Sequence, residues 1–322
     1  MKKILLTTLV LAFVLVSISG CANGTEQAPP DDGPQQFRIA MSLPTIDNDW
    51  QARLREIVDA EIAQQPDNFE FVVINAIDDG DQLNQLEVFL NDDFDAIIIL
   101  PNNGTLMTPI SEQIYNSGIP TIILDRAIDS DNFTSFISGD NVGGGANAAK
   151  FIGEFLDGEG DIVVLRSFAG TPIDMDRNSS FMEGIAEFPG INILVEGDGQ
   201  FNRQAGFQAM QNMLQAHAHI DGVFAQDDEA ALGALSAIEQ AGRTDIQIIT
   251  GFGGARAVFE RYAANDPDDI LRATMTYFPT MGLEGIRYAV ALLQGESIPR
   301  YIIIDSVVVT SENVHEFMQY SY

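Results

Sequence analysis

Carboxylate, amide, guanidinium and aromatic side chains recur in this sequence at or shortly after the ends of short apolar runs. The set that we single out comprises Asn48, Trp50, Asp125, Arg126, Arg177, Phe201, Asp227, Phe252 and Tyr277. Each carboxylate can accept two hydroxyl protons, and each guanidinium is a forked donor that keeps its charge. Planar rings can cover the C–H faces of a cyclic ligand. This chemistry suits a small molecule with a rim of hydroxyl groups, such as a sugar or a polyol.

Contacts of this kind are strong enough for useful affinity. A hydrogen bond to a charged group contributes about 1.5–3 kcal/mol, and a micromolar ligand needs only about 8 kcal/mol in total. A handful of such bonds, with ring stacking from Trp50 and Phe201, is therefore sufficient after the cost of ordering the groups.

The apolar runs that precede these residues are rich in β-branched and aromatic side chains and predict strands. They occupy residues 37–43, 69–76, 96–101, 121–125, 161–167, 191–197, 221–227, 246–252, 271–277 and 301–309. Segments of helical period lie between them, for example 141–156, 203–214 and 228–241. This alternation predicts an α/β protein with two doubly wound parallel sheets. Ligands of such sheets bind beyond the carboxyl ends of the strands, where the residues above are found.

Composition excludes several classes of function. The 322 residues carry 47 Asp and Glu against 16 Lys and Arg, a formal charge of −31, which would repel nucleic acid and acidic membranes. The single cysteine rules out an intrachain disulfide and a thiolate metal cluster. His217 and His219 are close in sequence, but the only other histidine is His315, so we interpret the pair as solvated loop residues. We expect no metal and no cofactor.

The N-terminal residues predict export. Lys2 and Lys3 precede an apolar stretch that is too short to span a membrane, as in a secretory signal peptide over residues 1–20. The sole cysteine, Cys21, follows Gly20, and this segment resembles the lipobox of bacterial lipoproteins, which implies acylation of Cys21 and a lipid anchor at the cell envelope. An ordinary signal with an accidental cysteine is the alternative. Residues 21–36 are rich in proline and polar residues and predict a disordered tether.

Five segments are similar to a known family. They are ILDRAID (123–129), SGDNVGGGANAAKFIGEFL (138–156), AGTPIDMDRNSSFMEGI (169–185), QFNRQAGFQAMQNMLQAH (200–217) and VFAQDDEAALGALSAIEQAG (223–242). They resemble periplasmic sugar-binding proteins of the ribose/galactose type, the solute receptors of ABC importers. The similarity extends over nearly all of residues 37–313.

The resemblance implies the type I periplasmic binding protein fold, in which two α/β lobes enclose a sugar and three segments cross between them. The crossings fall near residues 138–139, 277–278 and 304–305. The N-terminal lobe would then comprise residues 37–138 and 278–304, and the C-terminal lobe 139–277 and 305–322. A monomer that closes on its ligand and docks on ABC permease subunits is implied.

The family also implies roles for individual residues. Asp125 and Arg126 match a pair that binds sugar hydroxyls, Arg177 and Phe201 match an arginine and a stacking phenylalanine of the second lobe, and Asn48 and Trp50 stand where the family has an asparagine and an aromatic residue.

Other positions depart from the ribose pattern. Phe252 matches an aromatic residue, but Gly253 stands where an aspartate is expected. Asp227 stands in place of asparagine, Tyr277 in place of glutamine, and Leu100 in place of a polar residue. We therefore expect a ligand larger than, or substituted relative to, a plain pentose.

Alternatives remain at this point. The protein could be a transport receptor, a sensory sugar receptor that presents its closed form to a chemotaxis or kinase partner, or a lipid-anchored carbohydrate enzyme. Trp50 and Phe252 could be core residues rather than ligand contacts. Asp228 and Glu229 are expected in the first turn of a helix, where acids are favoured by the helix dipole.

Overall fold

The computed structural model describes residues 35–322. The predicted signal peptide, the predicted acylation site Cys21 and nearly all of the predicted tether therefore lie outside the described residues. Two six-stranded sheets organise the rest of the chain. Within this described part, no helix combines the length and apolar character needed to cross a membrane.

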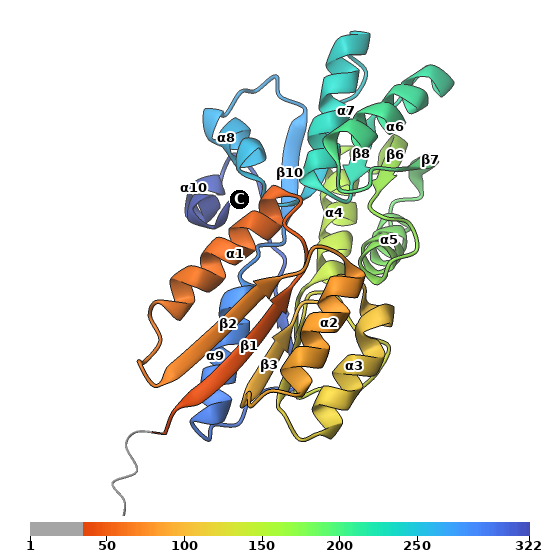
Figure 1. The fold of residues 1–322 in the computed structure, drawn as a ribbon. Helices are drawn as coiled ribbons and strands as arrows, with labels where there is room; N and C mark the ends of the chain where they lie inside the picture. The colour runs from red at the N-terminus through yellow and green to blue at the C-terminus, as the bar shows by residue number, and fades with distance from the viewer. Residues whose placement is uncertain (1–34) are drawn as a thin grey trace, which may run out of the picture. The chain divides into compact units, whose positions relative to one another are not determined.

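The first sheet is parallel throughout and has the strand order β11-β5-β4-β3-β1-β2. Its strands are β1 (Phe37–Leu43), β2 (Phe69–Asn75), β3 (Ala96–Ile99), β4 (Thr121–Leu124), β5 (Ser135–Gly139) and β11 (Tyr301–Ile304). Helices α1 (Asp49–Ile62) and α9 (Met281–Leu293) cover one face, and α2 (Asp79–Leu90) and α3 (Gly104–Asn116) cover the other (Figure 1). We call this sheet with its four helices the first lobe.

The second sheet repeats the same order, as β12-β10-β9-β8-β6-β7, with only β12 antiparallel. Its strands are β6 (Glu159–Arg166), β7 (Gly190–Asp198), β8 (Gly222–Ala225), β9 (Ile248–Gly253), β10 (Leu271–Thr276) and β12 (Val308–Val309). The helices that go with it are α4 (Asn141–Phe155), α5 (Pro172–Ile185), α6 (Arg203–Ala216), α7 (Asp228–Ala241), α8 (Arg256–Ala264) and α10 (Val314–Phe317), followed by the 3-10 turn η1 (Met318–Tyr320). We call this sheet with these helices the second lobe.

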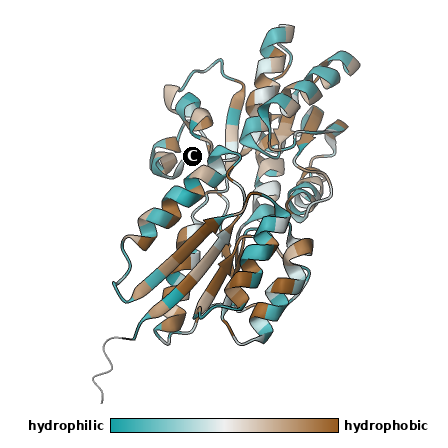
Figure 2. Ribbon diagram, viewed as in Figure 1, coloured by the Kyte–Doolittle hydropathy of each residue, from teal (hydrophilic) through white to brown (hydrophobic). Residues whose placement is uncertain are grey.

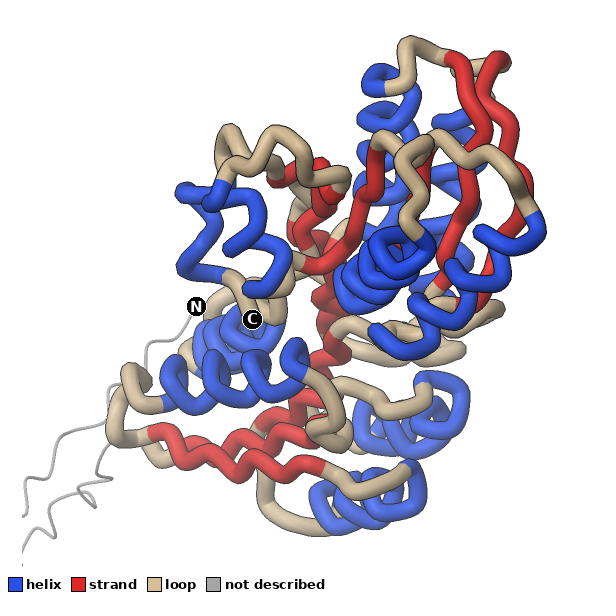
Figure 3. Tube along the Cα trace, turned by 90° about the horizontal axis from the view of Figure 1, so that it is seen from above, coloured by secondary structure: helices blue, strands red, loops and turns tan. Residues whose placement is uncertain are grey.

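Both faces of each sheet are buried, which explains the continuous apolar runs. In β1, Ile39 and Met41 pack with α1 and α9, whereas Ala40 between them packs with α2 and α3. In β6, Ile162 and Val163 likewise belong to different apolar clusters. Successive side chains of a strand point to opposite faces, so a sheet covered by helices on both sides needs apolar residues at consecutive positions. Figure 2 shows mostly brown strands in the first sheet, and Figure 3 shows helices on both sides of the strands.

The doubly wound α/β architecture predicted from the sequence is confirmed. Every predicted strand run contains a strand, but residues 301–309 form two strands, one in each sheet, rather than one. β5 was not among the predicted strands, because its sequence, SFISG, is short and mixes serine and glycine with its apolar residues.

Three segments pass between the lobes side by side. The chain leaves the first lobe after β5, returns after β10, and leaves again after β11. The Asp140 amide donates to the Ile304 carbonyl at 2.9 Å, and the Thr276 amide to the Val307 carbonyl at 2.9 Å. Gly139 is required by the close approach of these segments, since a Cβ there would lie 2.3 Å from the Tyr277 ring. The exact lobe boundaries given above stay a prediction.

Candidate functional site

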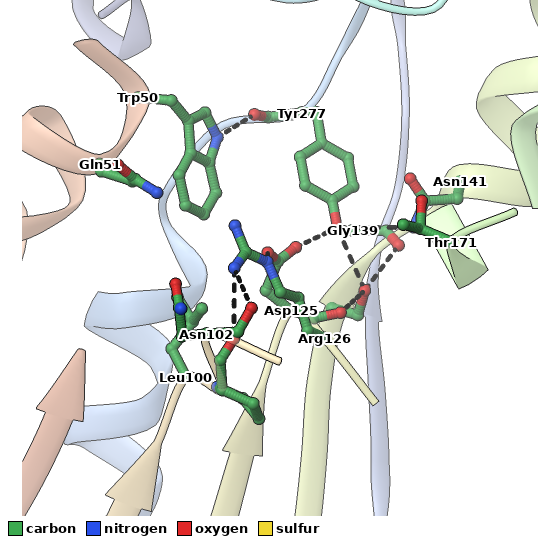
Figure 4. A network of polar contacts seen from close by, with 12 residues as sticks. Trp50, Gln51, Leu100, Asn102, Asp125, Arg126, Gly139, Asn141, Thr171 and Tyr277 are labelled. Carbon is green, nitrogen blue, oxygen red and sulfur yellow. Dashed lines mark hydrogen bonds and ion pairs between the residues drawn. The ribbon is translucent and has the colours of Figure 1, made fainter. Parts of the chain in front are cut away.

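Asp125 and Tyr277 form the centre of the polar network in Figure 4. Asp125 directly follows β4 and has the left-handed conformation (φ 59°), which aspartate tolerates better than most residues. Its Oδ1 accepts a 2.6 Å hydrogen bond from the Tyr277 hydroxyl, and Ser138 Oγ lies 3.3 Å from the same hydroxyl. Burial and the nearby Asp125 charge raise the pKa of Tyr277, so its hydroxyl remains a neutral donor.

Arg126 extends from the next position and is held by main-chain carbonyls. Its Nη1 donates to the Asn102 carbonyl at 2.8 Å, and its Nε lies 3.7 Å from Asp125 Oδ2. The loop after β3 is fixed in turn by Gln82, which is fully buried and whose Oε1 accepts from the Asn102 amide at 2.6 Å. Leu100 donates no side-chain group to this network, but its carbonyl accepts from Gln82 at 2.9 Å. The Arg126 side chain keeps 32% exposure.

Trp50 lies in the first turn of α1 and faces the same cluster. Its indole Nε1 donates to the Tyr277 carbonyl at 2.8 Å, and the two ring centroids are 6.3 Å apart. The next residue, Gln51, is buried, and its Oε1 accepts from the Asp47 amide at 2.8 Å. Figure 4 shows the Gln51 amide nitrogen on the side of the network. Trp50 thus joins α1 of the first lobe to the second crossing segment.

Arg177 is the most enclosed charge of the set, with 3% exposure. It lies in α5, which begins at a side-chain cap from Thr171 followed by Pro172, a favoured first helical residue. Its Nε donates to Asn141 Oδ1 at 2.9 Å and its Nη1 to the Gln226 carbonyl at 2.6 Å. Among residues 35–322, no carboxylate comes within ion-pair distance of Arg177, and none of these residues accepts a hydrogen bond from Nη2.

Aromatic rings surround this guanidinium. Its carbon lies 3.8 Å from the Phe252 ring centroid, 4.8 Å from that of Tyr277 and 5.9 Å from that of Phe201. Phe252 is fully buried and belongs to the core, as its alternative interpretation proposed, yet one face supports Arg177. Phe201 has a left-handed backbone (φ 49°) before α6, and its ring contacts Phe168 at 5.6 Å. Burial lowers the pKa of Arg177 from its ordinary value, although guanidinium groups stay charged.

Asp227 and Asp228 differ in role. Asp227 caps α7 by accepting from the Ala230 amide at 3.1 Å, and burial, with repulsion by Asp228, raises its pKa to about 7. Asp228 lies in the first turn, as expected, but its buried carboxylate accepts from the Thr274 hydroxyl and from the Gly254 and Ala255 amides. The side-chain cap therefore belongs to Asp227, and Asp228 ties α7 to β10 and to the start of α8.

Asn48 is the predicted residue that these contacts do not join to the others. Its side chain is exposed, caps α1 by accepting from the Gln51 amide at 2.9 Å, and donates to Asp47. The remaining eight residues fall into two groups that meet at Tyr277. Trp50, Asp125 and Arg126 belong to the first group, and Arg177, Phe201, Phe252 and Asp227 to the second, where Asp227 is linked to Arg177 through charge.

Sequence reasoning missed the residues that bond to the two arginines and to Tyr277. Asn141 and Ser138 follow or end β5, which was not predicted, and strand-end position could have indicated them once β5 was found. The Asn102 and Gln226 carbonyls carry no side-chain signal at all. Within the described chain, no group of three or more histidine, cysteine, aspartate or glutamate side chains is arranged to hold a metal ion.

Comparison with known proteins agrees with this geometry. A family model described as a periplasmic binding protein domain matches residues 39–297. The ribose import binding protein RbsB of Bacillus subtilis is 28% identical over 305 residues, which cover 94% of this chain and 97% of that protein. The ribose import binding protein of Escherichia coli K12 is 31% identical over 217 residues, covering 67% and 71%.

Solved structures give the same result. An ABC transporter solute-binding protein from Bacillus halodurans with bound myo-inositol has a TM-score of 0.81 at 28% identity and covers 89% of this chain and 99% of its own. The binding component of an arabinose ABC transporter from Shewanella has a TM-score of 0.78 at 27% identity, covering 88% and 95%. The resemblance predicted from the sequence is confirmed, and the chain belongs to the periplasmic binding protein domain family.

Proposed function

We propose that this protein captures a sugar or polyol outside the cytoplasm and delivers it to the membrane subunits of an ABC importer. One observation carries the proposal: Asp125, Arg126 and Arg177 from two lobes converge with aromatic rings on Tyr277, at a segment that crosses between the lobes. The relatives named above, which by name import ribose or belong to ABC transporters, support the same role.

The free hydrogen-bonding capacity of the site defines which groups would hold the ligand. Asp125 has acceptor capacity beyond its bond to Tyr277, and Nη2 of Arg177 is unbonded to the described chain. The side chain of Arg126 stays partly exposed. We assign these three groups to ligand hydroxyls, and the rings of Trp50 and Phe201 to the ligand's C–H faces. Closure of the lobes would exclude water and strengthen each charged bond.

Uptake is favoured over sensing by the names of the relatives. A fructose-binding periplasmic domain of a hybrid two-component system is also similar, with a TM-score of 0.78 at 28% identity. Because that domain belongs to a two-component system, the two roles need separate readouts. Deletion of this protein should abolish uptake of its labelled ligand, and loss of a transcriptional response with unchanged uptake would instead assign the sensory role.

A thermal-shift screen tests the binding function. Sugars, polyols, nucleosides and small glycosides are offered to the purified protein without its first 20 residues, and a ligand at 100 times its Kd should add about 2.7 kcal/mol of stability. Hits are then titrated by calorimetry, with Arg55→Met as control, because Arg55 forms a surface ion pair with Asp59 on α1. Failure of every sugar and polyol to stabilise the protein would refute the proposal.

Ranking the hits tests the expected ligand size. A hexose, cyclitol or substituted sugar should bind more tightly than ribose, and ribose in first place would contradict that expectation. We propose binding without turnover, so the ligand should be recovered unchanged after prolonged incubation. Appearance of a hydrolysed product would point to the carbohydrate-enzyme alternative.

The lipid anchor is a separate proposal that rests on the sequence around Cys21. A radiolabelled palmitate should be incorporated into the wild-type protein, which should fractionate with membranes. Cys21→Ser should abolish labelling and release the protein. Retention at the membrane by the serine variant would exclude the anchor.

A further inference from the structure

Gly253, at the end of β9, lies in an unusual environment. Its backbone has φ +143°, a conformation that side-chain-bearing residues rarely adopt. A Cβ at this position would lie 2.1 Å from the hydroxyl oxygen of Tyr322 and 3.4 Å from Asp228 Oδ2. The space that a side chain of residue 253 would occupy is therefore not empty, because the Tyr322 hydroxyl fills it.

Neighbouring contacts place this position beside the candidate site. Phe252, which supports Arg177, directly precedes Gly253, and the Gly253 carbonyl accepts from the Tyr277 amide at 2.6 Å. The Tyr322 hydroxyl is close enough to Asp227, Asp228 and Arg177 for their charges to affect its pKa. Tyr322 thus meets the second group of site residues, although it is distant from them in sequence.

The segment that carries Tyr322 is firmly held. The Tyr322 carbonyl accepts from the Arg256 amide at 2.6 Å, and Ser321, which is buried, bonds to the Met318 carbonyl. Phe278, from the second crossing, contacts Phe317 and Tyr320 at centroid distances of 6.4 and 5.5 Å. The Tyr322 side chain itself packs, partly buried, against the apolar cluster of the second lobe.

The Tyr322 hydroxyl has unused hydrogen-bonding capacity. No residue of the described chain forms a hydrogen bond with it, and it is not sealed in the interior as the unbonded Tyr262 hydroxyl is. Burial and the neighbouring carboxylates raise the pKa of Tyr322 well above its ordinary value, so the group remains a neutral donor and acceptor. A hydroxyl in this state can exchange a hydrogen bond with a sugar hydroxyl.

We propose that Tyr322 is a specificity-determining residue of the sugar site, whose hydroxyl, over Gly253 and beside Asp227, bonds one hydroxyl of the bound ligand. This inference rests on the proposed function. The phenol takes the place of any side chain at position 253 and supplies a neutral group where a carboxylate would add a third negative charge next to Asp227 and Asp228. It favours a ligand that carries a hydroxyl at that point.

Tyr322→Phe is the direct test, because it removes only the oxygen. The best ligand from the screen and its complete series of monodeoxy analogues are titrated against both proteins. Loss of one neutral hydrogen bond weakens binding about three- to tenfold. The substitution should lower by that factor the affinity for the parent ligand and for every analogue that retains the contacted hydroxyl. One analogue, which lacks that hydroxyl, should bind both proteins equally.

Tyr320→Phe is the matched control, because it removes a tyrosine hydroxyl from the same segment and keeps the ring that contacts Phe278. It should leave the affinity for every analogue unchanged. Equal affinities of wild type and Tyr322→Phe for the whole series would overturn the inference. So would a uniform loss across the series, which indicates a purely structural role. Absence of sugar binding by the wild type would instead overturn the proposed function, and the inference with it.

A second pair of variants tests the contact itself. Gly253→Ala places a methyl group against the Tyr322 oxygen and should lower both the melting temperature and the affinity. Adding Tyr322→Phe removes the colliding atom and leaves the ring carbon at 3.3 Å. The double variant should therefore melt at a higher temperature than Gly253→Ala alone. A double variant that is no more stable would show that the hydroxyl does not lie over Gly253, and would overturn the inference.

Discussion

The two arginines of the site are held in opposite ways by the two lobes. Arg126, in the first lobe, keeps about a third of its side chain exposed, lies beside the Asp125 carboxylate and donates to main-chain carbonyls. Arg177, in the second lobe, is enclosed by aromatic rings and, among residues 35–322, bonds only to an amide oxygen and a carbonyl. The first lobe thus presents a partly exposed pair of opposite charges, Asp125 and Arg126, whereas the second lobe presents the desolvated guanidinium of Arg177.

This difference predicts an unequal division of affinity. A charged hydrogen bond is stronger where the surroundings are apolar, since less solvent screens it. Arg177 loses its hydration when the protein folds. A hydrogen bond from Arg177 to a ligand hydroxyl therefore requires little further desolvation of the guanidinium. We therefore expect the second lobe to contribute more binding free energy per hydrogen bond than the first.

The largest effect is expected from Arg177→Met. It removes the buried charge but keeps an apolar side chain against Phe252. Loss of charged bonds of about 1.5–3 kcal/mol each should weaken ligand binding by more than about 100-fold. The melting temperature of the ligand-free protein should change little, because relief from burying a charge offsets the bonds lost to Asn141 and Gln226.

Calorimetric titration and thermal denaturation measure the two quantities. Arg256→Met is the control from the same lobe, since Arg256 forms an exposed ion pair with Glu260. An affinity that survives Arg177→Met would mean that the ligand does not reach the second lobe's arginine.

Asp125→Asn should give the next largest effect. Asparagine also tolerates the left-handed backbone and can still accept from Tyr277, so the fold is preserved. The lost negative charge should weaken binding by about 10- to 100-fold, equivalent to one charged hydrogen bond. Tyr277→Phe, measured by the same titration, should cost less, because it removes a group that orients Asp125. A larger loss with Tyr277→Phe would reverse the roles of these residues.

Arg126→Met should have a smaller effect than Arg177→Met. The exposed part of its guanidinium is hydrated before binding, so its bond to the ligand is worth less, and we expect a loss of about tenfold or under. Equal losses for the two arginine variants in parallel titrations would contradict the proposed difference between the lobes.

The pH dependence of stability should reveal the enclosed surroundings of Asp227. Its pKa is about 7 in the folded protein against an ordinary value of 3.8, so the folded state binds more protons between these values. Stability from this group is fully present below pH 4 and is lost as pH rises towards 7. Asp227→Asn, which can still cap α7, should raise the melting temperature at pH 8 and leave it unchanged near pH 4.

Asp245→Asn provides the opposite case. Arg243 lowers the pKa of Asp245, so this carboxylate stabilises the protein above its ordinary pKa, and the stabilisation is lost as pH falls. This variant should therefore melt at a lower temperature at pH 8. If both variants shift stability in the same direction at pH 8, the assigned environment of Asp227 is wrong.

The fold was more accessible to sequence reasoning than the site. Buried strands such as residues 96–101 are recognisable because both of their faces must be apolar, and the polar residues that follow them fall at one edge of the sheet. The hydrogen-bond partners of the two arginines could not be predicted in this way. Arg177 bonds to the Gln226 carbonyl and Arg126 to that of Asn102, and every residue has a carbonyl, so no side-chain pattern marks these two.

Asn48 and Tyr322 illustrate two things that residue spacing leaves open. Asn48 has a residue type suited to a sugar, but its side chain is engaged in capping α1. Tyr322 follows no predicted strand, and only the packing of η1 and α8 brings it over Gly253. Both outcomes depend on competition between local and distant partners, which spacing along the chain does not encode.

Tyr277 has one further consequence for motion. Its amide is fastened to β9 of the second lobe through the Gly253 carbonyl, whereas its own carbonyl is fastened to α1 of the first lobe through the Trp50 indole. If the lobes rotate and both bonds are kept, the second crossing segment must absorb the rotation through the φ and ψ torsions of Tyr277 alone. That residue also carries the phenol bonded to Asp125, so the torsions that would absorb the rotation belong to a residue of the candidate site.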